Sequence, residues 1–379
     1  MQNINQMLTE DVFLEQTGKI NAALTELLIA KGGHMKPTSW AEVQRMVRDG
    51  TAAKVFSIGD QLTCQRGGVN LVWDVIGIDH DTPADPQFTH SLTLQLHDCF
   101  STVIQFDAPE AFYYAENGLE ARTYHFTMGS TDYQFTLDSD VAAGGQLILN
   151  FTGSTPTSLS VSATVGGNFV KDTNGIDNLT IAVTAGSGGT PLDTDYINNI
   201  NRVIYGSNNY KESAIRQWLG SNAAAGSVWT PQTNFDRPPA WKNTAAGFMN
   251  GMDADFLAAI GKTHIVVARN TVTDGGGFDE MDDYFFFLSR SEVYGGAEVS
   301  GVNEGEPYPC YANYSDLSAP GTDPDSNRIK YGNGAARYWR LRTPNSEDGN
   351  KVRYVDLAGN LNVSNASIET RIVPACNII

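Results

Sequence analysis

A histidine between two carboxylates, Asp79-His80-Asp81, is the first group in the sequence whose residue types could do chemistry. An imidazole beside carboxylates can act as a general acid or base, or bind a metal ion. Neighbouring side chains at the end of a strand point to opposite sides, however, and the other histidines show no ligand spacing around His80. We therefore expect a structural or surface role for His80 rather than a catalytic one.

Cysteine and acidic residues offer little more. The four cysteines, Cys64, Cys99, Cys310 and Cys376, contain no Cys-x-x-Cys pair, so a zinc site is not expected. Synthesis in the cytosol favours free, buried thiols. The acidic runs at 279–283 and 323–327 offer the oxygen ligands that Ca²⁺ requires, which leaves a structural cation open as an alternative. We predict no dedicated metal site.

Sequence signatures of common enzymes are also missing. The sequence has no Ser-His-Asp order and no dinucleotide fingerprint, and the glycine run at 275–277 precedes neither a lysine nor a helical pattern. We therefore predict that the chain is not an enzyme and uses no cofactor.

Composition narrows the classes of partner. The net charge of -18 argues against a nucleic-acid surface, because binding phosphates needs clustered Lys and Arg. The same acidity discourages contact with anionic membranes. No apolar run approaches the length of a membrane span, and no basic and apolar signal segment follows Met1. We expect no signal peptide, no membrane insertion and synthesis in the cytosol.

The elements that must position any site begin with a helix predicted over residues 4–30. Its apolar stripe consists of Ile20, Leu24, Leu27 and Leu28, and Gly32-Gly33 ends it. Such a helix either mediates oligomerisation or attachment, or packs on its own domain. A second helix should begin at Ser39, which with Glu42 has the spacing of a capping box, and should end at Asp49.

Strand signals follow and then change in character. Strands are predicted at 55–58, 61–65, 69–78 and 91–96, which suits a mixed domain. Residues 104–197 show repeated period-two alternation between glycine-rich turns, a pattern typical of an antiparallel sandwich. Mixed structure returns afterwards, with helices predicted at 211–219 and 253–260 and strands at 263–268 and 284–288.

The C-terminal block combines a regular pattern with polar loops. Residues 338–344 (Tyr-Trp-Arg-Leu-Arg-Thr-Pro), 352–356, 359–361 and 371–378 alternate with the polar runs 345–350 and 362–370. Loops on a rigid scaffold can present binding groups, because they are free of the packing constraints of a core. The alternative is that these runs are ordinary solvated turns rich in Asn, Ser and Gly.

These C-terminal motifs resemble the C-terminal lobe of C-type-lectin-like domains. The matching subgroup occurs in phage and gut-bacterial proteins, shares its fold with formylglycine-generating enzymes, and includes targets of diversity-generating retroelements. Further matches lie at 72–81, 204–219 and 287–295, so the resemblance spans most of residues 34–379. The triplets of calcium-dependent sugar-binding lectins are missing, and Cys310 and Cys376 lie in no motif of the formylglycine-generating family.

The resemblance implies a division of the C-terminal block into structural and binding positions. Tyr338, Leu341 and Arg342 are expected to be structural. Trp339-Arg340 replaces the commoner double aromatic and Thr343 the commoner Ser, which implies a less aromatic surface. The positions expected to be exposed and to bind ligand are Trp339, Arg340, Asn345, Ser346, Glu347, Asp348, Asn350, Tyr354, Leu357, Asn362, Ser364, Asn365 and Ser367.

The resulting prediction is an α+β protein with four parts. Residues 1–33 form an N-terminal helix for oligomerisation or attachment, 34–103 and 198–379 form a C-type-lectin-like domain, and 104–197 form an inserted all-β sandwich. The function implied is non-enzymatic ligand or receptor binding in a phage or prophage tail or head fibre, with or without retroelement diversification. Alternatives are a structural virion decoration protein and an oxidase of the formylglycine-generating type.

The resemblance and the N-terminal helix also imply binding partners. They are a host cell-surface protein or glycan for the C-terminal face and other virion proteins for the N-terminal helix. We expect a homo-oligomer that is made in the bacterial cytoplasm and located in the phage particle, with no nucleic acid bound.

Overall fold

The described residues form an α+β protein built mostly from sheet. The computed structural model describes residues 16–24, 37–108, 208–230, 232, 238–271, 274–311 and 326–379, and between 109 and 207 only the strands bounded below and residues 139–140. The predicted α+β class is confirmed at this level. Of the helix predicted over 4–30, residues 16–24 are described and are helical, and the remainder lies outside the described residues.

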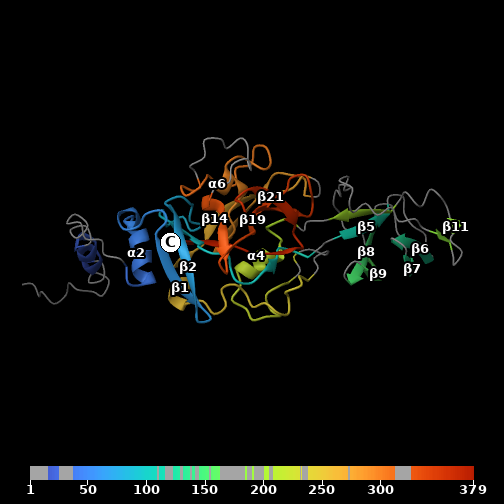
Figure 1. Ribbon diagram of the computed structural model, residues 1–379, viewed down its shortest axis with the longest axis horizontal. Coiled ribbons are helices and arrows are strands. Elements are labelled where there is room, and N and C mark those ends of the chain that lie inside the picture. Colours follow the sequence, from blue (N-terminus) through green and yellow to red (C-terminus); the bar gives the residue numbers. More distant parts are fainter. Residues whose placement is uncertain are drawn as a thin grey trace, which may run out of the picture.

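The main sheet brings the last strand of the chain against one of the first. Its strands are all antiparallel and run in the order β1-β2-β3-β23-β13, while β16 also pairs with β23. The bounds are β1 (Gln61–Arg66), β2 (Val69–Ile78), β3 (Leu92–Leu96), β13 (Ile260–Gly261), β16 (Phe285–Phe286) and β23 (Ala375–Ile378). Cys376 lies opposite Leu94, and in Figure 1 the C-terminal label lies over the blue strands of this sheet. The two parts of the predicted domain, before and after the insert, therefore share one sheet.

The first described helix of the main body, α2 (Trp40–Arg48), follows the prediction closely. Ser39 is its N-cap and accepts a hydrogen bond from the Glu42 amide at 3.3 Å, and Val43 and Val47 are buried. The expected reciprocal bond goes elsewhere, since Glu42 accepts from the amide of Thr38. The strand predicted at 55–58 is wrong, because a short 3-10 helix, η2 (Ala52–Lys54), precedes a turn there.

Three further helices are short, and a serine side chain caps the first and the last of them. They are α4 (Ala214–Leu219), α5 (Ala254–Ala259) and α6 (Arg290–Tyr294), and a second 3-10 turn, η4 (Ser326–Arg328), follows later. Ser289 and Glu292 form a complete capping box at α6, with both hydrogen bonds present. This box fixes the start of a helix of only five residues and places Glu292 facing inwards.

One hydrophobic core joins the main sheet, the helices and the C-terminal sheet. Its largest fully buried side chains include Trp73, Trp218 and Trp339. The ring centroid of Phe285 lies 6.0 Å from that of Trp73 and 5.1 Å from that of Phe248. Removing such a side chain from water contributes roughly 2–3 kcal/mol each, so the aromatic residues of the C-terminal motif belong to the core that holds the fold together.

Strands from the predicted insert form two separate four-stranded sheets. One has the order β12-β5-β8-β9 and the other β11-β10-β6-β7, with antiparallel pairing throughout. Their bounds are β5 (Ala111–Ala115), β6 (Thr123–Met128), β7 (Thr131–Thr136), β8 (Gly145–Thr152), β9 (Thr155–Ser162), β10 (Thr184–Ala185), β11 (Thr190–Pro191) and β12 (Ile200–Ile204). The antiparallel pairing agrees with the predicted alternation. The strand signal at 179–183 lies outside the described residues, and packing into a sandwich stays a prediction.

The start of the predicted insert belongs to the main body instead. Strand β4 (Ile104–Gln105) pairs with β22 (Glu369–Thr370), and the Phe106 amide donates to the Ala366 carbonyl at 3.0 Å. Ile104 and Phe106 are each 1% exposed. Their burial against the C-terminal block moves residues 104–108 out of the insert, and the other domain boundaries stay predictions.

The C-terminal block forms a small sheet beside two hairpins. Its order is β19-β20-β21, and the hairpins are β14 with β15 and β17 with β18. The bounds are β14 (Thr263–Ala268), β15 (Phe278–Asp283), β17 (Lys330–Gly332), β18 (Ala335–Arg337), β19 (Trp339–Pro344), β20 (Lys351–Val355) and β21 (Leu361–Asn365). All residues of β19 are buried. Figure 1 shows β19 and β21 in red near α6.

Candidate ligand-binding surface

The register of the C-terminal sheet decides which predicted residues share a face. Tyr354 on β20 lies opposite Arg340 on β19 and opposite Asn362 on β21. Direct cross-strand partners project their side chains on the same side of a sheet. Arg340, Tyr354 and Asn362 therefore lie on one face, and Trp339, whose partner is Val355, lies on the other.

Trp339 and Arg340, which were predicted to be exposed, are buried. Trp339 is 0% exposed, and its indole Nε1 donates to the Arg328 carbonyl at 2.9 Å. Arg340 is 1% exposed. Its Nη2 donates to the carbonyls of Asn365 at 2.7 Å and Ile368 at 3.1 Å. Exposure of Trp339 and Arg340 is therefore a wrong prediction, because β19 is covered on both faces.

Of the three neighbouring positions that were expected to be structural, two are buried and one is exposed. Leu341 and Arg342 are 0% and 1% exposed, so their predicted burial is confirmed. Tyr338 is 46% exposed, however. It directly precedes the buried strand β19, and its ring meets that of Tyr354 edge to face, with 5.5 Å between centroids and 82° between planes.

The predicted polar loop at 345–350 is held in place by two residues far away in sequence. Asn208 donates from Nδ2 to the carbonyls of Asp348 at 2.6 Å and Lys351 at 2.9 Å. Asn345, only 9% exposed, donates to the Asp348 carboxylate. The expected exposure of Asn345 is therefore wrong, since this side chain closes the loop on itself.

Glu298 is the second residue that anchors this loop. Its side chain is 1% exposed and accepts two hydrogen bonds from Arg353, at 2.8 and 2.7 Å, one from Arg290 at 2.9 Å and one from the Ser346 amide at 3.1 Å. Burial opposes ionisation of Glu298, but the hydrogen bonds and the charge of Arg353 outweigh it and lower the pKa of the carboxyl. Within this loop Glu347 is exposed, and Asp348 and Asn350 are half-buried.

The remaining predicted positions lie on β20, β21 and their connections. Leu357 is 43% exposed, and Asn362 is exposed. Tyr354, Ser364, Asn365 and Ser367 are half-buried. The predicted set is thus split, with Asn345, Ser346 and Asp348 around Asn208 and Glu298, and Tyr354 and Ser364 at a pocket elsewhere on the sheet.

This pocket, which we call the tyrosine pocket, has a volume of about 370 Å³. It is lined by Val103, Arg337, Tyr338, Tyr354, Ser364, Ile368, Glu369, Thr370 and Arg371. Val103, Tyr338 and Ile368 are 39%, 46% and 50% exposed. An exposed cluster of apolar and aromatic side chains with a few polar groups is the usual make-up of a ligand site.

Sequence reasoning missed most of this pocket. Val103 comes from the segment before β4, and Ile368 from the connection between β21 and β22. An isolated apolar residue in a polar run, as at Ile368, is the one signal that the sequence offered.

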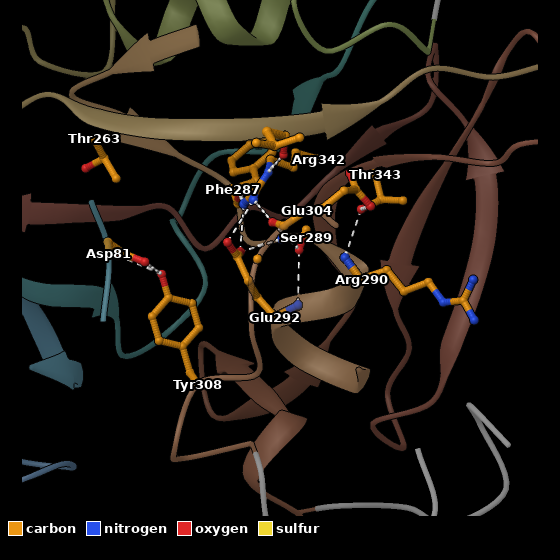
Figure 2. A network of polar contacts seen from close by, with 12 residues as sticks. Asp81, Thr263, Phe287, Ser289, Arg290, Glu292, Glu304, Tyr308, Arg342 and Thr343 are labelled. Carbon is orange, nitrogen blue, oxygen red and sulfur yellow. Dashed lines mark hydrogen bonds and ion pairs between the residues drawn. The ribbon is translucent and has the colours of Figure 1, made fainter. Parts of the chain in front are cut away.

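A buried network of polar side chains, which we call the frame network, joins Arg342, Thr343, Ser289, Glu292 and Glu304. Figure 2 shows Arg342 pointing towards Glu292, with Arg342 Nη1–Glu292 Oε2 and Arg342 Nη2–Glu292 Oε1 each at 2.7 Å. Arg342 also donates to the Phe287 carbonyl at 2.8 Å. Because β19 carries Arg342 and α6 carries Glu292, the ion pair fastens the C-terminal sheet to that helix.

Glu304 occupies the other end of the frame network. Its Oε2 accepts from Thr343 Oγ1 at 2.8 Å, and its Oε1 accepts from the Ala268 amide at 3.0 Å. Burial raises the pKa of Glu304 from its ordinary 4.5 to about 7. Burial also raises the pKa of Glu292, and the facing guanidinium of Arg342 opposes that rise. The positive charge of Arg342 therefore acts on both buried carboxyl groups and opposes the rise in the pKa of each.

Residue 305 must be a glycine because its backbone passes close to the Glu292 side chain of this network. Its φ is 124°, which L side chains rarely adopt, and a Cβ at this position would lie 2.5 Å from Glu292 Oε1. A larger residue after Glu304 would therefore collide with Glu292, a constraint that only the structure reveals.

Comparison with known proteins finds a family for the C-terminal half of the chain. The model of a family described as a domain of unknown function, DUF6273, matches residues 187–379, which is half of the chain. The chain belongs to the DUF6273 family. No curated protein matches the chain, and no solved structure matches it. The DUF6273 match contains the frame network and every residue of the tyrosine pocket except Val103.

Outside the DUF6273 match, the Asp79-His80-Asp81 triplet joins a second buried cluster. Asp81 accepts hydrogen bonds from Tyr308 Oη at 2.8 and 2.9 Å and from Thr93 Oγ1 at 2.8 Å. The His80 ring stacks on Tyr308 with 4.2 Å between centroids. Burial opposes protonation of His80, but Asp81 outweighs it and raises the histidine pKa. These contacts fit the structural role predicted for His80.

Among the described residues, inside the DUF6273 match or outside it, no group of three or more His, Cys, Asp or Glu residues could hold a metal ion. The acidic run at 323–327 lies mostly outside the described residues. All four cysteines are free thiols, as predicted, and Cys64, Cys99 and Cys376 are buried while Cys310 is half-buried. In the parts of the chain that are described, no helix has the length and apolar character needed to cross a membrane.

Proposed function

We propose that the chain is a non-enzymatic ligand-binding protein and that the tyrosine pocket is its binding site. The observation that carries this proposal is the pair of Tyr338 and Tyr354, which meet at 5.5 Å on the surface while the strand between them is buried and fixed by Arg340 and Arg342. Rigid aromatic side chains on a fixed scaffold give a large contact area at a low cost in entropy. Tyr and Arg are also the residue types enriched at binding hot spots.

The fold proposed for this site is C-type-lectin-like. The sequence resemblance of residues 338–378 and the motifs upstream support it, and the α+β class is consistent with it. The remaining predicted positions around Glu347, Leu357 and Asn362 would then extend the binding surface beyond the pocket.

The biological setting proposed is a receptor-binding fibre of a phage or prophage particle, in which the ligand is a host surface protein or glycan. A decoration protein of the virion, with the same surface used only for assembly, is the runner-up. The nucleotide sequence separates fixed from diversified versions: a near-duplicate of the 3′ end beside a reverse-transcriptase gene would indicate retroelement diversification.

Binding of the purified full chain to a panel of intact gut-bacterial strains, followed by flow cytometry, tests the proposal. The double variant Tyr338→Ala/Tyr354→Ala should bind at least about 30-fold more weakly, as expected for the loss of roughly 2 kcal/mol at a hot spot. The matched control is Tyr331→Ala, because Tyr331 is 49% exposed but does not line the pocket.

Two results would contradict the proposal. One is unchanged binding by the double variant, and the other is an equal loss in Tyr331→Ala. Thermal melting of each variant shows whether the fold is retained, since exposed substitutions usually change stability by about 0.5 kcal/mol or less.

A further inference from the structure

The charge around the tyrosine pocket is opposite in sign to that of the chain. Arg337 and Arg371 line the pocket together with one carboxylate, Glu369. A third arginine, Arg340, donates to the carbonyls of Ser364 and Ile368, each at 3.1 Å, and both of these residues line the pocket. Three guanidinium groups against one carboxylate leave an excess of two positive charges, in a chain of net charge -18.

These three arginines have no carboxylate partner among the described residues. Arg337 Nε donates to the Gly332 carbonyl and Arg371 Nη1 to the Phe100 carbonyl, each at 3.1 Å. Arg340 donates only to backbone carbonyls, and its buried Nε has no hydrogen-bond partner in the described chain. By contrast, Arg342 and Arg353 each form a bidentate pair with a glutamate. Backbone carbonyls satisfy hydrogen bonds but leave the positive charge uncompensated.

Burial lowers the pKa of Arg340 to about 10, so its guanidinium stays charged at neutral pH. A charge in a poorly solvated position acts on its neighbours more strongly than one in water. Arg340 therefore adds to the positive potential from below, while Arg337 and Arg371, both half-buried, offer donors at the surface.

We propose that the tyrosine pocket takes an acidic saccharide, with the sugar carboxylate at Arg337 and Arg371 and an apolar ring face against Tyr338 and Tyr354. The inference deepens the proposed binding function and rests on it. Guanidinium groups match carboxylates in shape and charge, and aromatic faces accept the C–H face of a sugar ring.

The size and rim of the pocket favour a sugar over a folded protein surface. A volume of about 370 Å³ is at the small end of ligand sites and suits one or two rings. The rim adds the hydroxyls of Ser364 and Thr370 and the carboxylate of Glu369, which can exchange hydrogen bonds with sugar hydroxyls.

Isothermal titration calorimetry of the full chain with matched saccharide pairs tests this inference. The pairs are tetragalacturonate and its methyl ester, sialyllactose and lactose, and a hyaluronan tetrasaccharide and its methyl ester. At least one acidic member should bind, and its neutral counterpart should bind at least about tenfold more weakly, since a charge-assisted hydrogen bond is worth at least that factor. Raising the salt concentration should weaken only the acidic member.

Substitutions of the two pocket arginines test whether they supply the positive charge that binds the ligand. Arg337→Gln and Arg371→Gln should each weaken the acidic ligand about tenfold, whereas Arg337→Lys and Arg371→Lys should retain part of the binding. The matched control is Arg45→Gln on α2, which removes an arginine charge away from the pocket and should change nothing. Melting curves confirm that each variant is folded.

The outcomes separate this inference from the function on which it rests. Equal affinity for acidic and neutral members, or binding of none of the acidic saccharides, overturns the ligand class. So does loss of cell binding after protease treatment of the cells, which would identify a protein receptor. In each case the proposed function still stands if Tyr338→Ala/Tyr354→Ala weakens cell binding. If that double variant binds cells normally, both proposals fail.

Discussion

Arg342 and Glu292 form a bidentate ion pair in the interior, with both N–O distances at 2.7 Å and side-chain exposures of 1% and 5%. The pair joins strand β19 of the C-terminal motif to helix α6 of the motif at 287–295. Two sequence motifs that are about fifty residues apart are thus the two halves of one contact.

The first prediction is that breaking this pair destabilises the fold strongly. Arg342→Met and Glu292→Gln should each cost roughly 3–5 kcal/mol, because each leaves a buried group without its partner. The double variant should cost clearly less than the sum of the two, since it removes both unpaired groups together. Urea unfolding of the four proteins measures this, and additive losses would contradict the coupling.

The second prediction concerns Glu304, whose raised pKa of about 7 ties stability to pH. In the folded chain Glu304 keeps its proton up to about pH 7, while in the unfolded chain it loses the proton near pH 4.5. Between these values the folded state binds more protons, so stability falls as pH rises. The contribution is complete below pH 4.5 and lost above pH 7, a change on the order of 3 kcal/mol.

Glu304→Gln should remove that slope, because the amide can donate to Thr343 and accept from the Ala268 amide at any pH. The measurement is the free energy of unfolding in urea from pH 4.5 to 8 for both proteins. Glu306→Gln is the matched control, since Glu306 is exposed two residues further on. Parallel profiles for the wild type and Glu304→Gln would show that Glu304 does not titrate in this range.

Local signals in the sequence predicted local structure well. The Ser39–Glu42 spacing located the start of α2, because a cap depends on residues within one turn of each other. The strand signals at 61–65 and 69–78 located β1 and β2, and along β1 exposed residues alternate with buried or half-buried ones. Both signals act over a few residues.

The assignment of sides in β19 failed for a physical reason. Alternation distinguishes a buried from an exposed face only where a strand has an exposed face, and β19 is covered on both. Arg340 looks like a surface residue by type, yet its guanidinium is buried because four backbone carbonyls receive its hydrogen bonds. No sequence pattern reports that those carbonyls converge there.

The candidate site depends on contacts between distant segments. Asn208 lies about 140 residues before the loop that it fastens, and Val103 precedes every other lining residue of the pocket by more than 230 residues. Val103 lies beside the pocket because the strand that follows it, β4, pairs with β22, whose residues line the pocket. A single sequence carries no signal for that pairing.

The third prediction is that the N-terminal helix mediates self-association. Residues 16–24 are helical, and Ile20 and Leu24 are 64% and 53% exposed on one side of that helix. A short helix gains most of its stability by burying its apolar face, so Ile20→Asp/Leu24→Asp should convert an oligomer into a monomer. Light scattering measures the masses, with Ala22→Asp on the opposite side as control.

A chain lacking residues 1–33 should likewise be monomeric. Identical masses for the intact chain and the truncated chain would rule out this role for the helix, leaving the main body as the only source of any oligomer.

The last prediction separates buried from exposed positions in the C-terminal block. Trp339→Ala should cost roughly 3–5 kcal/mol and Leu341→Ala roughly 2–5 kcal/mol, because both side chains are fully buried and leave cavities. Glu347→Ala and Asn362→Ala should stay within about 0.5 kcal/mol of the wild type, since both residues are exposed. Urea unfolding gives all four values. A large loss of stability in Asn362→Ala together with a small one in Trp339→Ala would mean that the two faces of the sheet are assigned the wrong way round, and the tyrosine pocket would then lose its rigid support.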